Sequence, residues 1–277
     1  MQTIDAHHHL WKYDAKDYSW IGPEMGVLRR DFTPVDLHKE LQQAGVDGAI
    51  AVQARQTLQE TDWLLALAAQ HDFMRGVVGW APLIEASVAG ELQRLASQPK
   101  LKGIRHVLQD EPDDLYMLRD DFNAGISQLR RFNLVYDVLI FERHLPQTIQ
   151  FVDRHPDQAF VIDHIAKPRI RDGVLSPWRE NLKELARRSH CFCKLSGVLT
   201  EADWRDWRSE HIRPYLDAAL DAFGPKRCLF GSDWPVLLLA SSYAGWAGTV
   251  RRFVSTLSSA EQERVLGGTA AEVYRLD

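Results

Sequence analysis

Short hydrophobic runs alternate with amphipathic stretches from one end of the 277-residue chain to the other. Each run is dominated by Val, Ile, Leu, Phe and Cys with few polar interruptions, which is typical of parallel strands covered on both faces. The runs predict eight strands, at residues 3–7, 48–53, 74–80, 103–107, 134–140, 159–164, 191–195 and 227–231. Strands that alternate with helices in this way indicate an α/β fold.

The amphipathic stretches carry helix start and stop signals. Leu37, Leu41 and Ala44 form one hydrophobic face, and Gly45 follows them as a C-terminal cap. A second helix starts at Leu145-Pro146, and a third has Ser176 as its N-cap with Pro177 in the first turn. A further helix ends at Gly224, and residues 259–262 form a capping box. Helices therefore follow strands throughout the chain, and a last helix lies near the C-terminus.

Eight strand and helix units predict a (β/α)8 barrel that forms a single domain over residues 1–277. A doubly wound open sheet is the alternative. It is less favoured because no GxGxxG or GxxxxGK[ST] motif follows any strand, and the same absence argues against a nucleotide cofactor. The longest irregular stretch, residues 10–34, follows the first strand, so we expect it to fold over the mouth of the barrel.

Composition narrows the class of protein. The chain is 45% hydrophobic and 26% charged, with a net charge of −5, and no basic run marks a nucleic-acid partner. It has no stretch of 18 consecutive hydrophobic residues and does not begin with a secretory signal pattern, so we expect a cytoplasmic protein without a membrane partner. Three cysteines without a CxxC pair fit a reducing compartment.

Three of the predicted strands end in residues that can carry chemistry. The first ends with His7 and His9, whose spacing places both imidazoles on one side of an extended chain. The sixth ends with His164 and the eighth with Asp233. Each of them alone could be a solvated histidine, a buried hydrogen-bonded histidine or a helix cap. Because the strand ends of a barrel meet at one mouth, the three sites together indicate an active site.

The sequence resembles the amidohydrolase superfamily, in its branch of sugar lactonases. The resemblance covers nearly the whole chain and rests on residues 4–11 (IDAHHHLW), 103–112 (GIRHVLQDEP), 163–168 (DHIAKP), 193–197 (CKLSG), 230–235 (FGSDWP) and 267–271 (GGTAA). Within the branch, residues 135–139 (VYDVL) and 199–204 (LTEADW) look most like the L-fuconolactonase type.

The resemblance implies hydrolysis of an aldonolactone by activated water. It assigns Asp233 as general base, with His164 and His9 as further catalytic residues. It also implies a candidate single divalent ion, such as zinc, on His7, His9 and Asp233, or catalysis without a metal. Two-metal members carry a bridging lysine or glutamate on strand 4 or 5. This sequence has Arg105 and Asp137 on those strands, which favours one ion or none.

A sugar lactone also needs hydrogen-bond partners for its hydroxyl groups. The strand-end candidates for substrate binding are Gln53, Arg55, Arg105, Asp137 and Ser196, with Trp234 able to pack on the ring. His106, Lys167 and Lys194 are interpreted as supporting residues behind the site. Three alternatives remain at this stage: a metal-dependent decarboxylase or amidase, a lactone isomerase, and a sugar-binding protein on a catalytically silent barrel.

Overall fold

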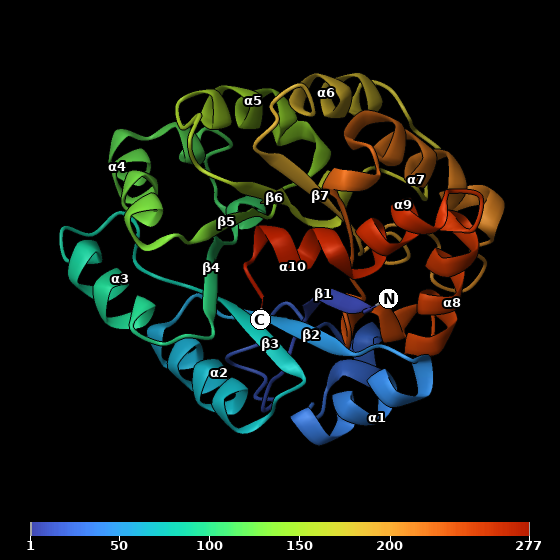
Figure 1. Ribbon diagram of the computed structural model, residues 1–277, viewed down its shortest axis with the longest axis horizontal. Helices are drawn as coiled ribbons and strands as arrows, with labels where there is room; N and C mark the ends of the chain where they lie inside the picture. Colours follow the sequence, from blue (N-terminus) through green and yellow to red (C-terminus); the bar gives the residue numbers. More distant parts are fainter. Residues whose placement is uncertain (1, 277) are drawn as a thin grey trace.

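Eight parallel strands form the centre of the computed structural model, which describes residues 2–276 (Figure 1). The strands are β1 Ile4–His8, β2 Gly48–Val52, β3 Met74–Gly79, β4 Leu101–His106, β5 Val135–Val138, β6 Phe160–Ile162, β7 Cys191–Leu195 and β8 Cys228–Phe230. They pair in chain order, and a parallel bridge between His8 and Trp234 joins the two ends of the sheet. The predicted (β/α)8 barrel is confirmed.

Helices surround the barrel. They are α1 Pro34–Ala44, α2 Leu58–Gln70, α3 Val88–Ala96, α4 Asp120–Leu129, α5 Leu145–Asp153, α6 Trp178–Leu185, α7 Ser209–Phe223, α8 Tyr243–Val254, α9 Ser259–Glu263 and α10 Thr269–Val273. The helices α1 to α8 lie around the strands, whereas α10 lies across one end of the barrel in the centre of Figure 1. None of the helices in residues 2–276 combines the length and hydrophobicity that a membrane crossing requires.

Two predicted helix starts are wrong. Ser258, rather than Ser259, caps α9, because its hydroxyl accepts from the Glu261 N–H while the Glu261 carboxylate accepts from the Ser258 N–H. Ser176 is not the N-cap of α6, which begins at Trp178 directly after Pro177. The start at Leu145 and the left-handed cap at Gly45 are confirmed.

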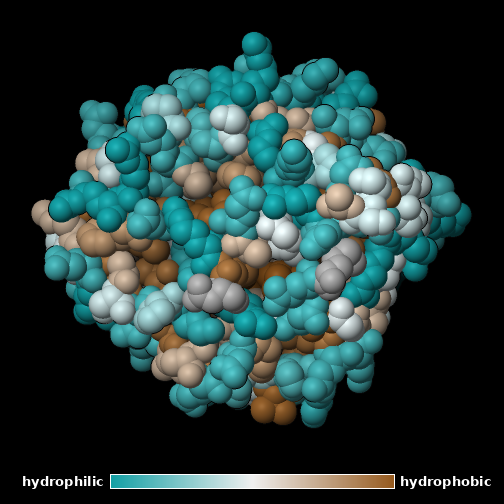
Figure 2. Space-filling view, in the orientation of Figure 1, coloured by the Kyte–Doolittle hydropathy of each residue, from teal (hydrophilic) through white to brown (hydrophobic). Residues whose placement is uncertain are grey.

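The hydrophobic core has two parts. The larger part fills the space between the strands and the helices. The smaller part fills the barrel interior, where Ile4, Val52 and Val161 meet Val273 and Tyr274 from the chain's last turn. Figure 2 shows the face around α10, where hydrophilic side chains cover most of the surface and hydrophobic ones show mainly in the hollows. The packing of Val273 and Tyr274 against the strand side chains closes the barrel interior at this end.

Candidate active site

A cavity of about 630 Å³ lies at the carboxyl ends of the strands. Its lining comes from several strand-to-helix loops and includes His9, Lys16, Asp17, Trp20, Arg55, Thr57, Arg105, Gln109, Asp110, Glu111, His164, Lys167 and Asp233. The segment at residues 10–34 supplies Lys16, Asp17 and Trp20, as expected of a loop over the mouth. A salt bridge of 3.1 Å between Arg55 and Asp17 ties this loop to the end of β2.

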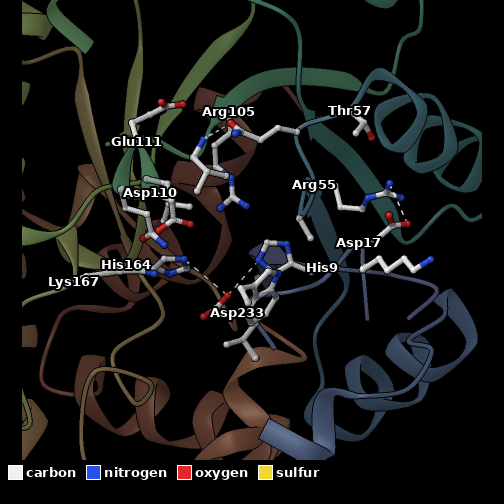
Figure 3. Close-up of a pocket in the computed structure, with 18 residues that line it drawn as sticks. His9, Asp17, Arg55, Thr57, Arg105, Asp110, Glu111, His164, Lys167 and Asp233 are labelled. Carbon is white, nitrogen blue, oxygen red and sulfur yellow. Dashed lines mark hydrogen bonds and ion pairs between the residues drawn. The ribbon is translucent and has the colours of Figure 1, made fainter. Parts of the chain in front are cut away.

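Asp233 is the point where the strand ends converge (Figure 3). Its Oδ1 lies 3.4 Å from His9 Nε2, 3.8 Å from His7 Nε2 and 3.9 Å from His164 Nε2. Two backbone hydrogen bonds fix this arrangement, from Asp233 N to His7 O at 2.8 Å and from His9 N to Trp234 O at 2.6 Å. Residues from β1, β6 and β8 thus meet in one pocket, although they are far apart in the sequence.

The backbone at the ends of β6 and β8 is held in an unusual conformation. Asp233 has a φ of 58°, and four consecutive residues, from His164 to Lys167, also have positive φ. Residues other than glycine rarely occupy this left-handed region, and it costs on the order of 1 kcal/mol or more each. The surrounding structure therefore orients His164 and Asp233 at the expense of local strain.

Each histidine at the site is oriented through its second ring nitrogen. His9 Nδ1 lies 2.8 Å from the carbonyl oxygen of Val52. A carbonyl can only accept, so Nδ1 carries the proton and Nε2 presents a lone pair to Asp233. His164 Nδ1 lies 2.9 Å from Ser196 Oγ, and His7 Nδ1 lies 3.3 Å from Asp163 Oδ1.

Burial controls the protonation of these groups. It lowers the pKa of His164 to about 4 and that of His7 well below its usual value, so both imidazoles are neutral near pH 7. Burial alone would raise the pKa of Asp233, but the nearby His164, His9 and Lys167 side chains hold it below its ordinary value. The pocket therefore combines neutral imidazoles with an ionised carboxylate, as a general base requires.

A buried network of charged groups lies behind the histidines. Asp163 lies 3.0 Å from Arg105 Nη1 and 2.9 Å from Lys194 Nζ, and Lys194 also contacts Asp137. Burial favours the neutral acid, yet Lys194, His7 and Arg105 hold the pKa of Asp163 well below its ordinary value. These neighbours keep Asp163 charged beside His7 Nδ1, while His7 Nε2 lies 3.4 Å from Arg105 Nη1 and 3.2 Å from His9 Nε2.

The structure brings five of the sequence-predicted site residues to the cavity: His9, Arg55, Arg105, His164 and Asp233. The others lie behind its wall. His7, Gln53, Ser196 and Trp234 are buried, and they contact His9, Arg105, His164 and Phe32, respectively. Lys167 differs from its prediction, since it lines the cavity instead of lying behind it.

Asp137 is the clearest correction among the substrate-binding predictions. It is fully buried, and the structure places it away from the cavity lining, where Lys194 and the Tyr274 hydroxyl bind its carboxylate. Its position follows from its neighbours, because the buried Lys194 ammonium needs a counter-charge. Hydrophobic spacing does not reveal which interior residues face the mouth and which face each other.

Several cavity residues have no role in the sequence-based interpretation. Lys16, Asp17, Gln109 and Glu111 line the cavity from loops, where no periodic pattern orients side chains. Glu111 belongs to the segment at residues 103–112 that carries part of the family resemblance, so its motif was a signal that could have found it. Gln109 belongs to the same segment, whereas Lys16 and Asp17 left no comparable signal.

The sequence profile of the amidohydrolase family matches residues 4–276. The chain belongs to the amidohydrolase family. This assignment agrees with the histidine and aspartate residues that the structure places at the ends of β1, β6 and β8.

Among curated relatives, an L-fucono-1,5-lactonase from Burkholderia multivorans is 47% identical over 99% of this chain and 96% of its own length. A second L-fucono-1,5-lactonase, from Burkholderia ambifaria, is 36% identical with the same coverage of both chains. The fold of this amidohydrolase is also similar to that of a Burkholderia multivorans amidohydrolase crystallised with bound HEPES. The TM-score is 0.97, with 45% identity and full coverage of both chains.

The donor set fits a divalent metal ion. One ligand atom from each of His7, His164 and Asp233 lies within 4.8 Å of the others, and His9 Nε2 lies 3.2 Å from His7 Nε2. Two donor atoms about 2.1 Å from one tetrahedral ion lie roughly 3.4 Å apart, close to this spacing. The expected set of His7, His9 and Asp233 therefore extends to His164. A similar structure, an amidohydrolase from Burkholderia multivorans with a TM-score of 0.96 and 46% identity over both full chains, contains bound zinc.

Proposed function

We propose that this amidohydrolase opens an aldonolactone of the L-fucono-1,5-lactone type to the corresponding aldonate. The observation that carries the proposal is the ionised Asp233 within 4 Å of three imidazoles at the bottom of a cavity large enough for a sugar ring. The two L-fucono-1,5-lactonases that match nearly the whole chain support the substrate class.

Asp233 acts as general base on the attacking water. It takes one proton as the water oxygen bonds to the lactone carbonyl carbon. When the bond from that carbon to the ring oxygen breaks, Asp233 returns the proton to the departing oxygen. The new carboxylic acid releases the second proton of the water to solvent, so the products are a carboxylate and a free hydroxyl group on one open chain. A single positioned carboxylate is sufficient because it is restored after each cycle.

Arg105 stabilises the negative charge that develops on the carbonyl oxygen, and His164 Nε2 contributes when no ion occupies the donor set. The Arg105 guanidinium is 3% exposed, lines the cavity, and is held by Asp163 and by the carbonyl oxygen of Gln53. Donors fixed in advance stabilise such charge more than mobile solvent does. We assign Arg55, which lines the cavity beside Asp17, to the sugar hydroxyl groups.

We further propose zinc as the ion of the donor set. His7, His9, His164 and Asp233 would hold it, and when bound it would polarise the lactone carbonyl as a Lewis acid. Lactones carry an alkoxide leaving group and need less polarisation than amides, so the residues above perform the proton transfers in either case.

A panel of aldonolactones in a weakly buffered pH-indicator assay tests the function, because ring opening releases acid. We expect rapid opening of L-fucono-1,5-lactone above the spontaneous rate, with the open aldonate identified by proton NMR. Absence of opening for every lactone in the panel would refute the proposal. A product with a migrated ring instead of an open chain would show an isomerase.

Metal content tests the zinc proposal independently of activity. We expect mass spectrometry of the purified protein to find about one zinc ion per chain, and His7→Asn to lose it, because His7 Nε2 faces both His9 and Asp233. Lys183→Met, on the exposed side of α6, is the control and should retain the metal. Full lactonase activity at negligible metal content would contradict the proposed contribution of zinc.

A further inference from the structure

The segment after β4 presents a carboxylate to the cavity that the mechanism above does not use. Glu111 directly follows the short 3-10 helix Leu108–Asp110 and lines the cavity. Three backbone N–H groups anchor the segment: Val107 N donates to Gln56 Oε1 at 2.8 Å, Gln109 N to Leu139 O at 3.1 Å, and Glu111 N to Leu108 O at 3.3 Å. The carboxylate therefore projects from a fixed backbone.

His106 holds one oxygen of this carboxylate. His106 Nε2 lies 2.6 Å from Glu111 Oε1, and His106 Nδ1 lies 3.4 Å from the indole nitrogen of Trp80. An indole N–H can only donate, so Nδ1 is the acceptor and the proton lies on Nε2, which donates to Glu111. The tautomer of His106 is thus fixed from behind.

The imidazole of His106 is itself held by packing. It is 7% exposed and stacks on Tyr116 with ring centroids 5.1 Å apart and planes 9° from parallel. Phe122 contacts it edge-on at 5.7 Å. Rotation of His106 would break both ring contacts and two hydrogen bonds, so Glu111 is oriented by a rigid support.

The second oxygen of Glu111 is available to a ligand. Within residues 2–276 the structure gives Oε2 no hydrogen bond, and the side chain is about 20% exposed at the cavity wall. Figure 3 shows Glu111 on a wall apart from Asp233, so it faces the part of a ligand that is remote from the reacting carbonyl. An oriented carboxylate oxygen accepts strong hydrogen bonds from hydroxyl groups.

We propose that Glu111, positioned by His106, is a specificity-determining residue that accepts hydrogen bonds from ring hydroxyl groups of the lactone. This inference rests on the proposed lactonase function and adds how the enzyme distinguishes a sugar lactone from an unsubstituted ring. The contact forms with the hydroxyl groups and not with the reacting carbonyl. It therefore contributes to substrate binding and leaves the chemical step unchanged.

Two substrates separate this role from general damage to the site. L-Fucono-1,5-lactone and δ-valerolactone share the six-membered lactone ring, but δ-valerolactone has no hydroxyl groups. Glu111→Gln, which keeps the shape of the side chain, should raise KM for L-fucono-1,5-lactone about tenfold while kcat stays within about twofold. The kcat/KM for δ-valerolactone should stay within about twofold of wild type.

Two further variants complete the experiment. His106→Phe keeps an aromatic ring in the stack but removes the donor to Glu111. It should therefore raise KM for L-fucono-1,5-lactone, by less than Glu111→Gln does, and leave kcat/KM for δ-valerolactone unchanged. Asp113→Asn is the control, because it lies in the same loop but outside the cavity and also removes one negative charge. It should leave kcat/KM unchanged for both lactones.

The possible failures can be told apart. If Glu111→Gln lowers kcat/KM by the same factor for both lactones, or lowers it for neither, the proposed role of Glu111 is wrong while the lactonase function stands. A wild-type protein that opens neither lactone overturns both proposals.

Discussion

At the scale of single residues, the candidate site depends on close contacts that leave no room for a larger side chain. Gly197, directly after Ser196, has a φ of 62°, and a Cβ atom built on it would lie 2.5 Å from His164 Cγ. Real Cβ contacts are not this short, so any side chain at position 197 must displace the His164 ring.

Gly197→Ala should therefore reduce activity more than stability. Displacement of His164 breaks its contact with Ser196 and moves it relative to Asp233, and a shift near 1 Å can cost on the order of a hundredfold in rate. The strained φ should lower the free energy of unfolding by only about 1–2 kcal/mol. Steady-state kinetics and urea denaturation of the same preparation measure both quantities. Unchanged kinetics in a destabilised protein would contradict this prediction.

Glu60 gives a prediction about pH. It is 3% exposed in the first turn of α2, where its Oε2 accepts from the N–H groups of Ala54 and Arg55. Burial raises its pKa from the ordinary 4.5 to about 7, although these hydrogen bonds and the charges of Arg105 and Arg55 oppose the shift. Tyr18 also faces it. Between these two pKa values the folded protein binds the proton more tightly than the unfolded chain does.

The stabilisation from protonated Glu60 is therefore present near pH 5 and lost as the pH rises through 7. Glu60→Gln should remove this dependence. From pH 5 to pH 8, we expect the wild type to lose about 2–3 kcal/mol of unfolding free energy relative to the variant. Urea denaturation at several pH values measures the difference, and parallel curves for the two proteins would show the expectation to be wrong.

At the scale of secondary structure, the sequence predicted that each strand exists but not where it ends. The hydrophobic run at residues 159–164 predicted a strand through His164, whereas β6 ends at Ile162. The ladder stops there because the next residues enter the left-handed region and turn His164 into the cavity. The ends of strands at a site are thus set by the geometry of the site, which hydrophobic periodicity does not contain.

Helix starts show a similar limit. Ser258 and Ser259 both have a capping-box partner three residues later, Glu261 for the first and Gln262 for the second. The structure uses Ser258, because the carboxylate of Glu261 is a stronger acceptor for an orphan N–H than an amide oxygen is. The three-residue spacing is the same for Ser258 and Ser259, so spacing alone could not show which serine caps the helix.

The network behind the histidines joins several elements and gives a prediction about stability. Lys194 of β7 is fully buried and contacts Asp137 of β5 and Asp163 after β6, while the Tyr274 hydroxyl donates to Asp137 at 2.7 Å. Lys194→Met leaves two buried carboxylates without their shared cation. We expect the free energy of unfolding to fall by about 3–5 kcal/mol in urea denaturation. Lys183→Met is the exposed control. If both variants lose an equally small amount of unfolding free energy, the structural role of the network is contradicted.

At the scale of the whole molecule, the barrel explains why so much of the site could be predicted. A closed ring of parallel strands places every carboxyl end at one mouth, so His9, His164 and Asp233 could be assigned to one pocket before any coordinates were known. The same logic misplaced Asp137, since a strand residue can face the mouth or the closed interior. Contacts such as Tyr274 with Asp137 depend on how the last turn packs across the barrel, and no local pattern records that.

The central claim is that Asp233 activates water for lactone opening. The most direct test compares kcat of wild type and Asp233→Asn on L-fucono-1,5-lactone, after subtraction of the spontaneous rate, with circular dichroism to confirm that both proteins are folded. Asparagine keeps the shape of the side chain but cannot accept the proton, so we predict a fall in kcat of at least about a hundredfold. A folded Asp233→Asn protein that retains kcat within a few fold of wild type would contradict the mechanism.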